Sequence, residues 1–114
     1  MSAPPLQQLD ADVCAAPQLG PAAMAWAAQA GFRSVINNRP DFEGGLDQPT
    51  SAAIEAAAAA AGLRYAFLPV QPMLHSPEEV TRFAALLVEL PRPILVFCRS
   101  GARSGRLYRA ATGG

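Results

Sequence analysis

The sequence predicts an α/β fold in which helices cover both faces of a small, mainly parallel β-sheet. Three observations support this prediction. Short apolar runs typical of buried strands alternate with segments that carry helix caps and helix stops. The chain has 114 residues, which is enough for one hydrophobic core. Its composition, 51% hydrophobic and 16% charged, is that of a folded protein and not of a disordered chain.

The first predicted pair of elements is a helix followed by a strand. Pro21 suits the first turn of a helix over residues 21–30, and Gly31 is a typical residue to end it. The apolar run 32–37 then predicts a buried strand. After this strand, the prolines, glycines and Asx residues of NNRPDFEGGLDQP predict a loop.

The second pair begins at an alanine-rich segment. Thr50 or Ser51 can cap a helix of high alanine propensity, and Gly62 can end it. Residues 64–70 predict the next strand. Pro69 is expected at the end of this strand, because proline cannot donate a hydrogen bond to a sheet ladder.

The third pair has the clearest helix signal. Ser76 and Glu79 stand at capping-box spacing, Pro77 occupies the first helical position, and apolar residues follow at a helical period. Residues 94–97 then predict an apolar strand, and a last helix is expected over 102–110. Strands that alternate with helices in this way favour a parallel sheet.

The chain is predicted to form a single domain over residues 1–114, with an additional N-terminal strand within 6–13 as an option. No apolar run approaches the roughly 18 to 20 residues that a membrane span needs. The start, MSAPPLQQLD, lacks the basic and apolar regions of a signal peptide, so a cytoplasmic location is expected. The formal net charge is zero, which argues against binding to nucleic acid or to an anionic membrane by bulk electrostatics.

Two cysteines and one histidine are too few for a disulfide framework or a usual metal cluster, so neither a metal nor another cofactor is expected. The lone His75 is most simply a solvated loop residue. Cys14 could resolve a persulfide or disulfide on Cys98 only if folding brings the two together, and is otherwise a packed thiol.

Cys98 is the main candidate for chemistry, because it ends an apolar strand and is followed at once by glycines, serines and arginines. Gly101 and Gly105 allow a tight turn in which successive N–H groups converge on one point, and the following helix adds the positive end of its dipole. Such a turn holds an anion, and it also lowers the pKa of a thiol. The alternative is a small buried hydrophobic residue, which explains Cys98 but not its neighbours. Arg106 and Arg109, later in the helix, also fit ordinary surface positions.

Four segments together resemble the phosphatase-like domain of the beta-lactamase hydrolase-like proteins, in order and over about residues 6–110. They are GFRSVINNRPDFEG, the following QPT with its alanine helix, GLRYAFLPV and PILVFCRSGARS. The loop CRSGARS is also similar to the active loop of rhodanese-type sulfurtransferases. The resemblance implies a protein tyrosine phosphatase-like fold and a cysteine nucleophile. It leaves the reaction open, because members have been classed both as phosphatases and as sulfurtransferases, some fused to a metal-dependent hydrolase domain that oxidises persulfides.

The spacing around Cys98 favours sulfur over phosphate chemistry. Cysteine phosphatases use Cys-x5-Arg, whose arginine forks onto two phosphoryl oxygens. Here four residues separate Cys98 from Arg103, and Ser104 stands where that arginine would be. Phe97 replaces the histidine that usually precedes the cysteine. The shorter loop makes a smaller ring of donors, which suits the terminal sulfur of a persulfide better than a phosphoryl group.

Phosphatase chemistry would also need an acid to protonate the leaving oxygen. Asp41 and Glu43, in the loop after the strand 32–37, could reach the same edge of the sheet, although both also suit a solvated turn. Asn38 and Arg39 are expected either to support the cysteine loop or to make ordinary loop contacts.

The sequence thus supports three hypotheses, of which sulfur transfer is the first. Cys98 would take a sulfane sulfur from thiosulfate or a persulfide, carry it as a persulfide and pass it to a thiol or cyanide. Arg99 and Arg103 would bind the anionic donor. The loop N–H groups that would stabilise the persulfide belong to Ser100, Gly101, Ala102, Arg103 and Ser104.

The alternative is a cysteine-dependent phosphatase, in which Cys98 forms a phosphocysteine, Arg103 binds phosphoryl oxygens and Asp41 is the acid. The third hypothesis is a non-catalytic anion-binding or thiol redox-sensing module. The expected partners are a small anionic substrate, a thiol acceptor and, as a further candidate, a persulfide-oxidising metallohydrolase.

Overall fold

The computed structural model describes residues 4–113, so the first three residues and the last residue of the predicted domain lie outside it. A five-stranded sheet runs through the molecule in the order β1-β2-β5-β3-β4. β1 is antiparallel to β2, and the other neighbours are parallel. The strands are β1 (Gln7–Asp10), β2 (Val13–Ala16), β3 (Ser34–Asn37), β4 (Arg64–Phe67) and β5 (Ile94–Phe97). The predicted mainly parallel sheet is confirmed.

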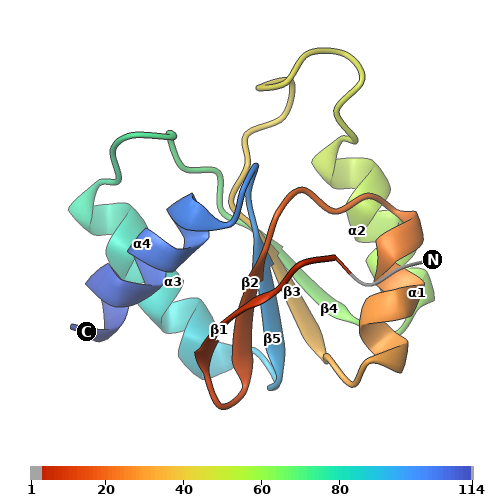
Figure 1. The fold of residues 1–114 in the computed structure, drawn as a ribbon, viewed down its shortest axis with the longest axis horizontal. Helices are drawn as coiled ribbons and strands as arrows, with labels where there is room; N and C mark the ends of the chain where they lie inside the picture. The colour runs from red at the N-terminus through yellow and green to blue at the C-terminus, as the bar shows by residue number, and fades with distance from the viewer. Residues whose placement is uncertain (1–3, 114) are drawn as a thin grey trace.

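In the described part of the chain, four helices cover the sheet, two on each face, as the α/β prediction requires (Figure 1). The pair on one face is α1 (Ala22–Gln29) and α2 (Ser51–Ala60). The pair on the other face is α3 (Pro77–Glu89) and α4 (Ala102–Thr112). Within residues 4–113, none of these helices has the length and apolar character to cross a membrane.

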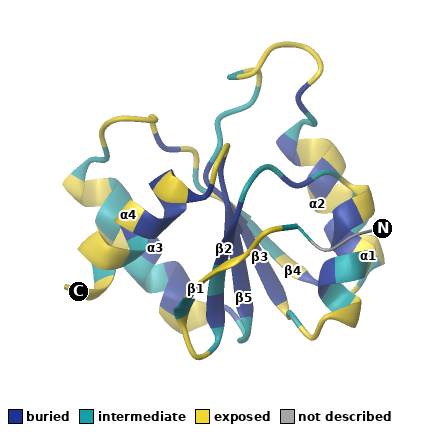
Figure 2. Cartoon of the chain, in the orientation of Figure 1, coloured by how far each residue is buried: buried dark blue, intermediate teal, exposed yellow. Residues whose placement is uncertain are grey.

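The core lies on both faces of β5, the central strand. Its side chains alternate: Leu95 and Phe97 pack in the cluster that includes α1 and α2, whereas Ile94 and Val96 pack in the cluster that includes α3 and α4. All four are fully buried, and the three central strands, β2, β5 and β3, form the buried centre in Figure 2. The end of β5 is therefore held firmly in place, and this is where Cys98 begins.

The predicted helix caps are present. Thr50 Oγ1 accepts a hydrogen bond from Ala53 N at 3.2 Å at the start of α2. At the start of α3, Ser76 Oγ accepts from Glu79 N at 3.1 Å, and Glu79 Oε1 accepts from Ser76 N at 2.7 Å.

The N-terminal prediction needs correction. The sequence suggests one optional strand within 6–13, but residues 7–16 form a hairpin whose second strand, β2, pairs with β5. β2 has the sequence VCAA, which carries a weak strand signal because only Val13 is β-branched. Its place next to β5 makes it a strand. Two further strands are shorter than predicted. β3 starts at Ser34 and not at residue 32, and β4 ends at Phe67 and not at residue 70.

Replacing Ser76 by Ala should lower the free energy of unfolding by about 1 kcal/mol. The reason is that Glu79 N, in the first turn of α3, loses the hydroxyl that accepts its hydrogen bond. Urea unfolding followed by circular dichroism measures the change. Glu78→Ala is the matched control: Glu78 lies in the same turn but outside the capping box, so its loss should be below about 0.5 kcal/mol. Equal losses in the two variants would show that the box contributes nothing beyond the helix dipole.

Candidate functional site

The candidate site lies at the edge of the sheet where the parallel strands end. Cys98 follows β5 directly and sits between the ends of β2 and β3. Cys98 N donates to Ala16 O at 3.4 Å, and Asn38 N donates to Phe97 O at 2.9 Å. The loops after β3, β4 and β5 rise from this same edge (Figure 1). The sheet order therefore brings together residues that are 60 positions apart in the chain, such as Asn38 and Cys98.

The loop after Cys98 turns tightly at Gly101 and continues into α4. Gly101 has a φ angle of +96°, which residues other than glycine rarely adopt. A Cβ at this position would lie 3.4 Å from Ala16 O. The turn points Gly101 N at Cys98 Sγ, at 3.1 Å. Ser100 Oγ accepts from Ala102 N at 3.3 Å, so the hydroxyl of Ser100 serves the turn itself. The sulfur thus lies at the N-terminal end of α4, where N–H groups converge.

These donors lower the pKa of the Cys98 thiol. Burial acts to raise the pKa, since the residue is only 1% exposed. Hydrogen bonds from the N–H and hydroxyl of Ser104, and from the N–H groups of Gly101 and Ser100, outweigh burial and hold it below the ordinary value. They stabilise the thiolate, which is the nucleophilic form of cysteine.

Ser104 and Asn38 link the cysteine loop to the neighbouring strands. Both side chains are fully buried. Ser104 Oγ donates to Asn38 Oδ1 at 3.0 Å, and Asn38 Nδ2 donates to Leu68 O at 3.0 Å. Asn38 thus contacts both the cysteine loop and the segment after β4. A hydroxyl has one proton to donate, so Ser104 Oγ donates either to Asn38 Oδ1 or to the sulfur, and the negative charge of the Cys98 thiolate favours the sulfur.

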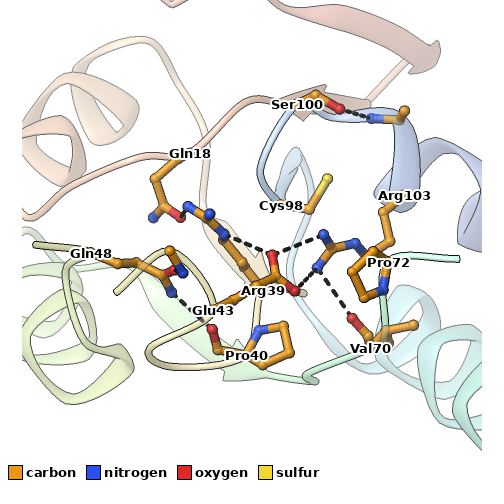
Figure 3. Close-up of polar contacts among 12 residues, drawn as sticks. Gln18, Arg39, Pro40, Glu43, Gln48, Val70, Pro72, Cys98, Ser100 and Arg103 are labelled. Atoms are coloured by element: carbon orange, nitrogen blue, oxygen red, sulfur yellow. Dashed lines mark hydrogen bonds and ion pairs between the residues drawn. The ribbon is translucent and has the colours of Figure 1, made fainter. Parts of the chain in front are cut away.

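A carboxylate joins two arginines beside this loop (Figure 3). Arg103 Nη2 donates to Glu43 Oε1 at 3.0 Å, and Nη1 donates both to Glu43 Oε2 and to Val70 O at 3.2 Å. Arg39 Nε donates to Glu43 Oε1 at 2.9 Å, and its Nη1 to Gln18 Oε1 at 3.0 Å. Arg103 therefore contacts the loops after β3 and β4, and the proposed contact of its guanidinium with substrate stays a prediction.

Glu43 has a larger role than the sequence suggests. Burial acts to raise the pKa of its carboxyl, but hydrogen bonds from Arg103 and Arg39 outweigh burial and lower the pKa, so Glu43 is ionised at neutral pH. From the sequence it is a second acid candidate or a turn residue. The i,i+4 spacing from Arg39 is a signal for one ion pair, but the pairing with Arg103 depends on the fold.

A pocket of about 440 Å³ opens at these groups. Its lining residues are Arg39, Glu43, Gly44, Pro72, Arg99 and Arg103. Arg99 is exposed at its mouth, whereas Arg103 is buried in its wall. Three of the six lining residues are arginines, and the pocket lies next to the cysteine loop, so it can hold an anionic group.

Other predicted residues lie outside the pocket lining. Asp41 Oδ1 accepts a hydrogen bond from Ser51 N at 2.7 Å, at the start of α2, and its role as an acid stays a prediction. Cys14 pairs with Leu95 in the sheet register, which places it three residues, or roughly 10 Å, along the strand direction from Cys98. Burial raises the pKa of the Cys14 thiol. The structure does not bring Cys14 next to Cys98. Arg106 Nη2 donates to Pro72 O at 2.5 Å.

Comparison with known proteins decides the family. The family described as the phosphatase-like domain of beta-lactamase hydrolase-like protein matches residues 5–114. The chain belongs to this family. A beta-lactamase hydrolase-like protein of Xylella fastidiosa is 40% identical over 81 residues, which are 71% of this chain and 19% of that protein. The matched part of this chain thus spans about a fifth of the length of this relative.

Solved structures show the same fold. A candidate phosphatase from Neisseria meningitidis is 32% identical and superposes with a TM-score of 0.81, over 89% of this chain and 71% of that one. A mutant form of Tk-PTP superposes with a TM-score of 0.67 at 17% identity, over 84% of this chain and 61% of that one, which shows the fold alone. The predicted protein tyrosine phosphatase-like fold of this family is confirmed.

The alkylation rate of Cys98 by iodoacetamide should reach half of its plateau at a pH below that of a free cysteine, because the loop donors lower the thiol pKa. Ser104→Ala should move this midpoint upward, since the thiolate loses one hydroxyl donor. The measurement uses a Cys14→Ser background, so that one thiol reacts.

Ser100→Ala is the matched control, because its hydroxyl accepts from Ala102 N and does not reach the sulfur in the contacts described. An unchanged midpoint in Ser104→Ala, or an equal shift in both variants, would contradict a specific role for Ser104.

Glu43→Gln should lower the free energy of unfolding at pH 7 by about 1 to 3 kcal/mol, because it leaves Arg103 without a countercharge in a site that is largely buried. The folded-state pKa of Glu43 is below its ordinary value of 4.5. The stabilisation by the ionised Glu43 is thus complete above pH 4.5, and it is lost as the pH falls through the lowered pKa of the folded state.

Chemical unfolding of the wild type and Glu43→Gln at pH 7 and at pH 3 tests this, and the difference between the proteins should shrink at the lower pH. Glu55→Gln, an exposed carboxylate on α2, is the control and should change stability by less than about 0.5 kcal/mol. A difference that grows on acidification would rule out the paired carboxylate.

Proposed function

We propose that this chain is a cysteine-dependent phosphatase-like hydrolase that acts on small phosphate esters. The supporting observation is the Cys98 thiolate, which lies among converging N–H donors at the start of α4 in a chain of the phosphatase-like family. The family and its fold favour the phosphatase alternative over the sulfur-transfer hypothesis that the loop spacing suggests.

The thiolate starts the reaction. Cys98 Sγ donates an electron pair to phosphorus, and the bond from phosphorus to the ester oxygen breaks with its electron pair, which leaves an alkoxide or phenoxide. Water then attacks the phosphocysteine, inorganic phosphate leaves and the thiolate is restored. In this reaction the loop N–H groups, which converge near Cys98, donate to the phosphoryl oxygens as charge collects on them, and the dipole of α4 adds to their effect.

The leaving oxygen needs a proton unless it leaves as a stable anion. Glu43, the carboxylate that lines the pocket, is held ionised by two arginines and cannot donate that proton. Aryl phosphates, whose phenolate leaving group needs little help, should therefore react faster than alkyl phosphates. Asp41 is the alternative acid only if it leaves Ser51 N.

Sulfur transfer is the second candidate, and one observation favours it. Four residues separate Cys98 from Arg103, and the guanidinium of Arg103 binds Glu43 and Val70 O. A loop of this length makes a small ring of donors around the thiolate, with Ser104 in the position of the usual arginine. Such a ring suits the terminal sulfur of a persulfide. In this reaction Cys98 Sγ attacks the outer sulfur of thiosulfate, sulfite leaves with the electron pair of the S–S bond, and an acceptor thiolate later removes the sulfur.

Two assays on one preparation distinguish these reactions. Phosphatase function predicts continuous release of p-nitrophenol from p-nitrophenyl phosphate, at a rate that falls by about 100-fold or more in Cys98→Ser, because the nucleophile is lost. Sulfur transfer predicts a mass gain of about 32 Da after incubation with thiosulfate, reversed by cyanide and absent in Cys98→Ser.

Cys14→Ser is the matched control for both assays and should behave like the wild type, since Cys14 lies on β2 away from the loop. Turnover that survives Cys98→Ser would show a contaminating phosphatase and count against the proposal. A mass gain without phosphate release would replace the proposed function by sulfur transfer.

A further inference from the structure

The pocket next to the cysteine loop carries more positive than negative charge. Three guanidinium groups, those of Arg39, Arg99 and Arg103, line it together with one carboxylate, that of Glu43. The lining therefore has a surplus of two positive charges at neutral pH. A single phosphoryl group on Cys98 would be surrounded by the loop N–H groups of Ser100, Gly101 and Ser104, which are separate from these guanidinium groups.

The arginines in the pocket wall are not fully paired. Arg103 is 7% exposed, and its Nε is buried without a hydrogen-bond partner in the described part of the chain. An unpaired N–H in a buried guanidinium costs free energy, and an anion that draws the group into the pocket would remove this cost. Arg39 uses Nε and Nη1 for Glu43 and Gln18, and its Nη2 makes no hydrogen bond within residues 4–113.

Gly44 keeps the space beside Arg39 free. A Cβ at this position would lie 2.7 Å from Arg39 Nη2, closer than real side chains approach. The φ angle of Gly44 is not in the positive range, so the backbone conformation alone does not require glycine. A side chain here would displace the end of the Arg39 side chain, and its absence leaves the unpaired nitrogen of Arg39 at the pocket.

We infer that this pocket is a second anion subsite, so that the preferred substrate carries a further anionic group beside the phosphoryl group that reacts at Cys98. Arg39 and Arg99 bind the second group, and Arg103 contributes when its guanidinium turns from Glu43. The inference rests on the proposed function in taking the reacting group to be a phosphate. The substrate class is a small ester with two anionic groups, such as a bisphosphate or a phosphorylated acid.

Binding of non-hydrolysable phosphonates tests the subsite without requiring turnover. Isothermal titration calorimetry at pH 7 and matched ionic strength compares methylphosphonate, with one anionic group, and propane-1,3-bisphosphonate, with two. The wild type should bind the bisphosphonate about tenfold more tightly or better, because a forked contact to a second anion adds about 1.4 kcal/mol or more. Arg39→Gln should reduce this preference to less than about threefold and leave methylphosphonate binding within a factor of about three.

Arg64→Gln is the matched control, because it removes the same charge at the opposite edge of the sheet, where β4 begins, and should keep the full preference. If Arg39→Gln unfolds at a lower temperature than the wild type, the test uses Arg99→Gln instead, because Arg99 is exposed. This variant should likewise reduce the bisphosphonate preference. Equal affinities of the wild type for the two phosphonates, or a preference that survives in Arg39→Gln, would overturn the inference.

Hydrolysis of p-nitrophenyl phosphate by the same preparation separates the two proposals. Turnover without a bisphosphonate preference keeps the phosphatase and removes the subsite. A preference without turnover keeps the anion subsite and removes the phosphatase.

Discussion

The site depends on the pairing of β5 with β2 on one side and β3 on the other. Both neighbours are parallel to β5, so all three strands end at the same edge of the sheet. The four residues of β5 are fully buried and alternate between the two core clusters, which leaves the strand little freedom to shift its register. Cys98 takes its position from this constraint, and Asn38 reaches it because β3 ends alongside.

The electrostatics of the site divide into two neighbouring parts. Around Cys98 the donors are neutral N–H and O–H groups and the dipole of α4, and the groups that lower its pKa include no guanidinium. In the adjacent pocket, Arg39 and Arg103 share the carboxylate of Glu43, which links the loop after β3 to α4. Nucleophile and fixed positive charge are thus provided by different groups, a division that the clustering of arginines near Cys98 in the sequence does not reveal.

The length of the cysteine loop explains this division. With four residues between Cys98 and Arg103, the arginine side chain leaves the loop toward Glu43 and Val70 O, and Ser104 stands next to the sulfur. A hydroxyl at that position donates one hydrogen bond and carries no charge, whereas a guanidinium would fork onto two oxygens. A phosphoryl group at Cys98 therefore relies more on backbone N–H groups and on the helix dipole than it does in a Cys-x5-Arg loop.

Local signals in the sequence determined most elements. The capping box at Ser76, the alanine helix after Thr50 and the apolar run 94–97 depend on near neighbours, so the sequence alone predicts them, together with the cysteine loop. The tertiary structure decided what depends on distant residues. β2 becomes a strand because it lies beside β5, and Glu43 becomes a shared partner because Arg103 approaches it from 60 positions away. Strand pairing and ion pairs between distant segments arise only when the sheet order places those segments side by side, and no local pattern encodes that order.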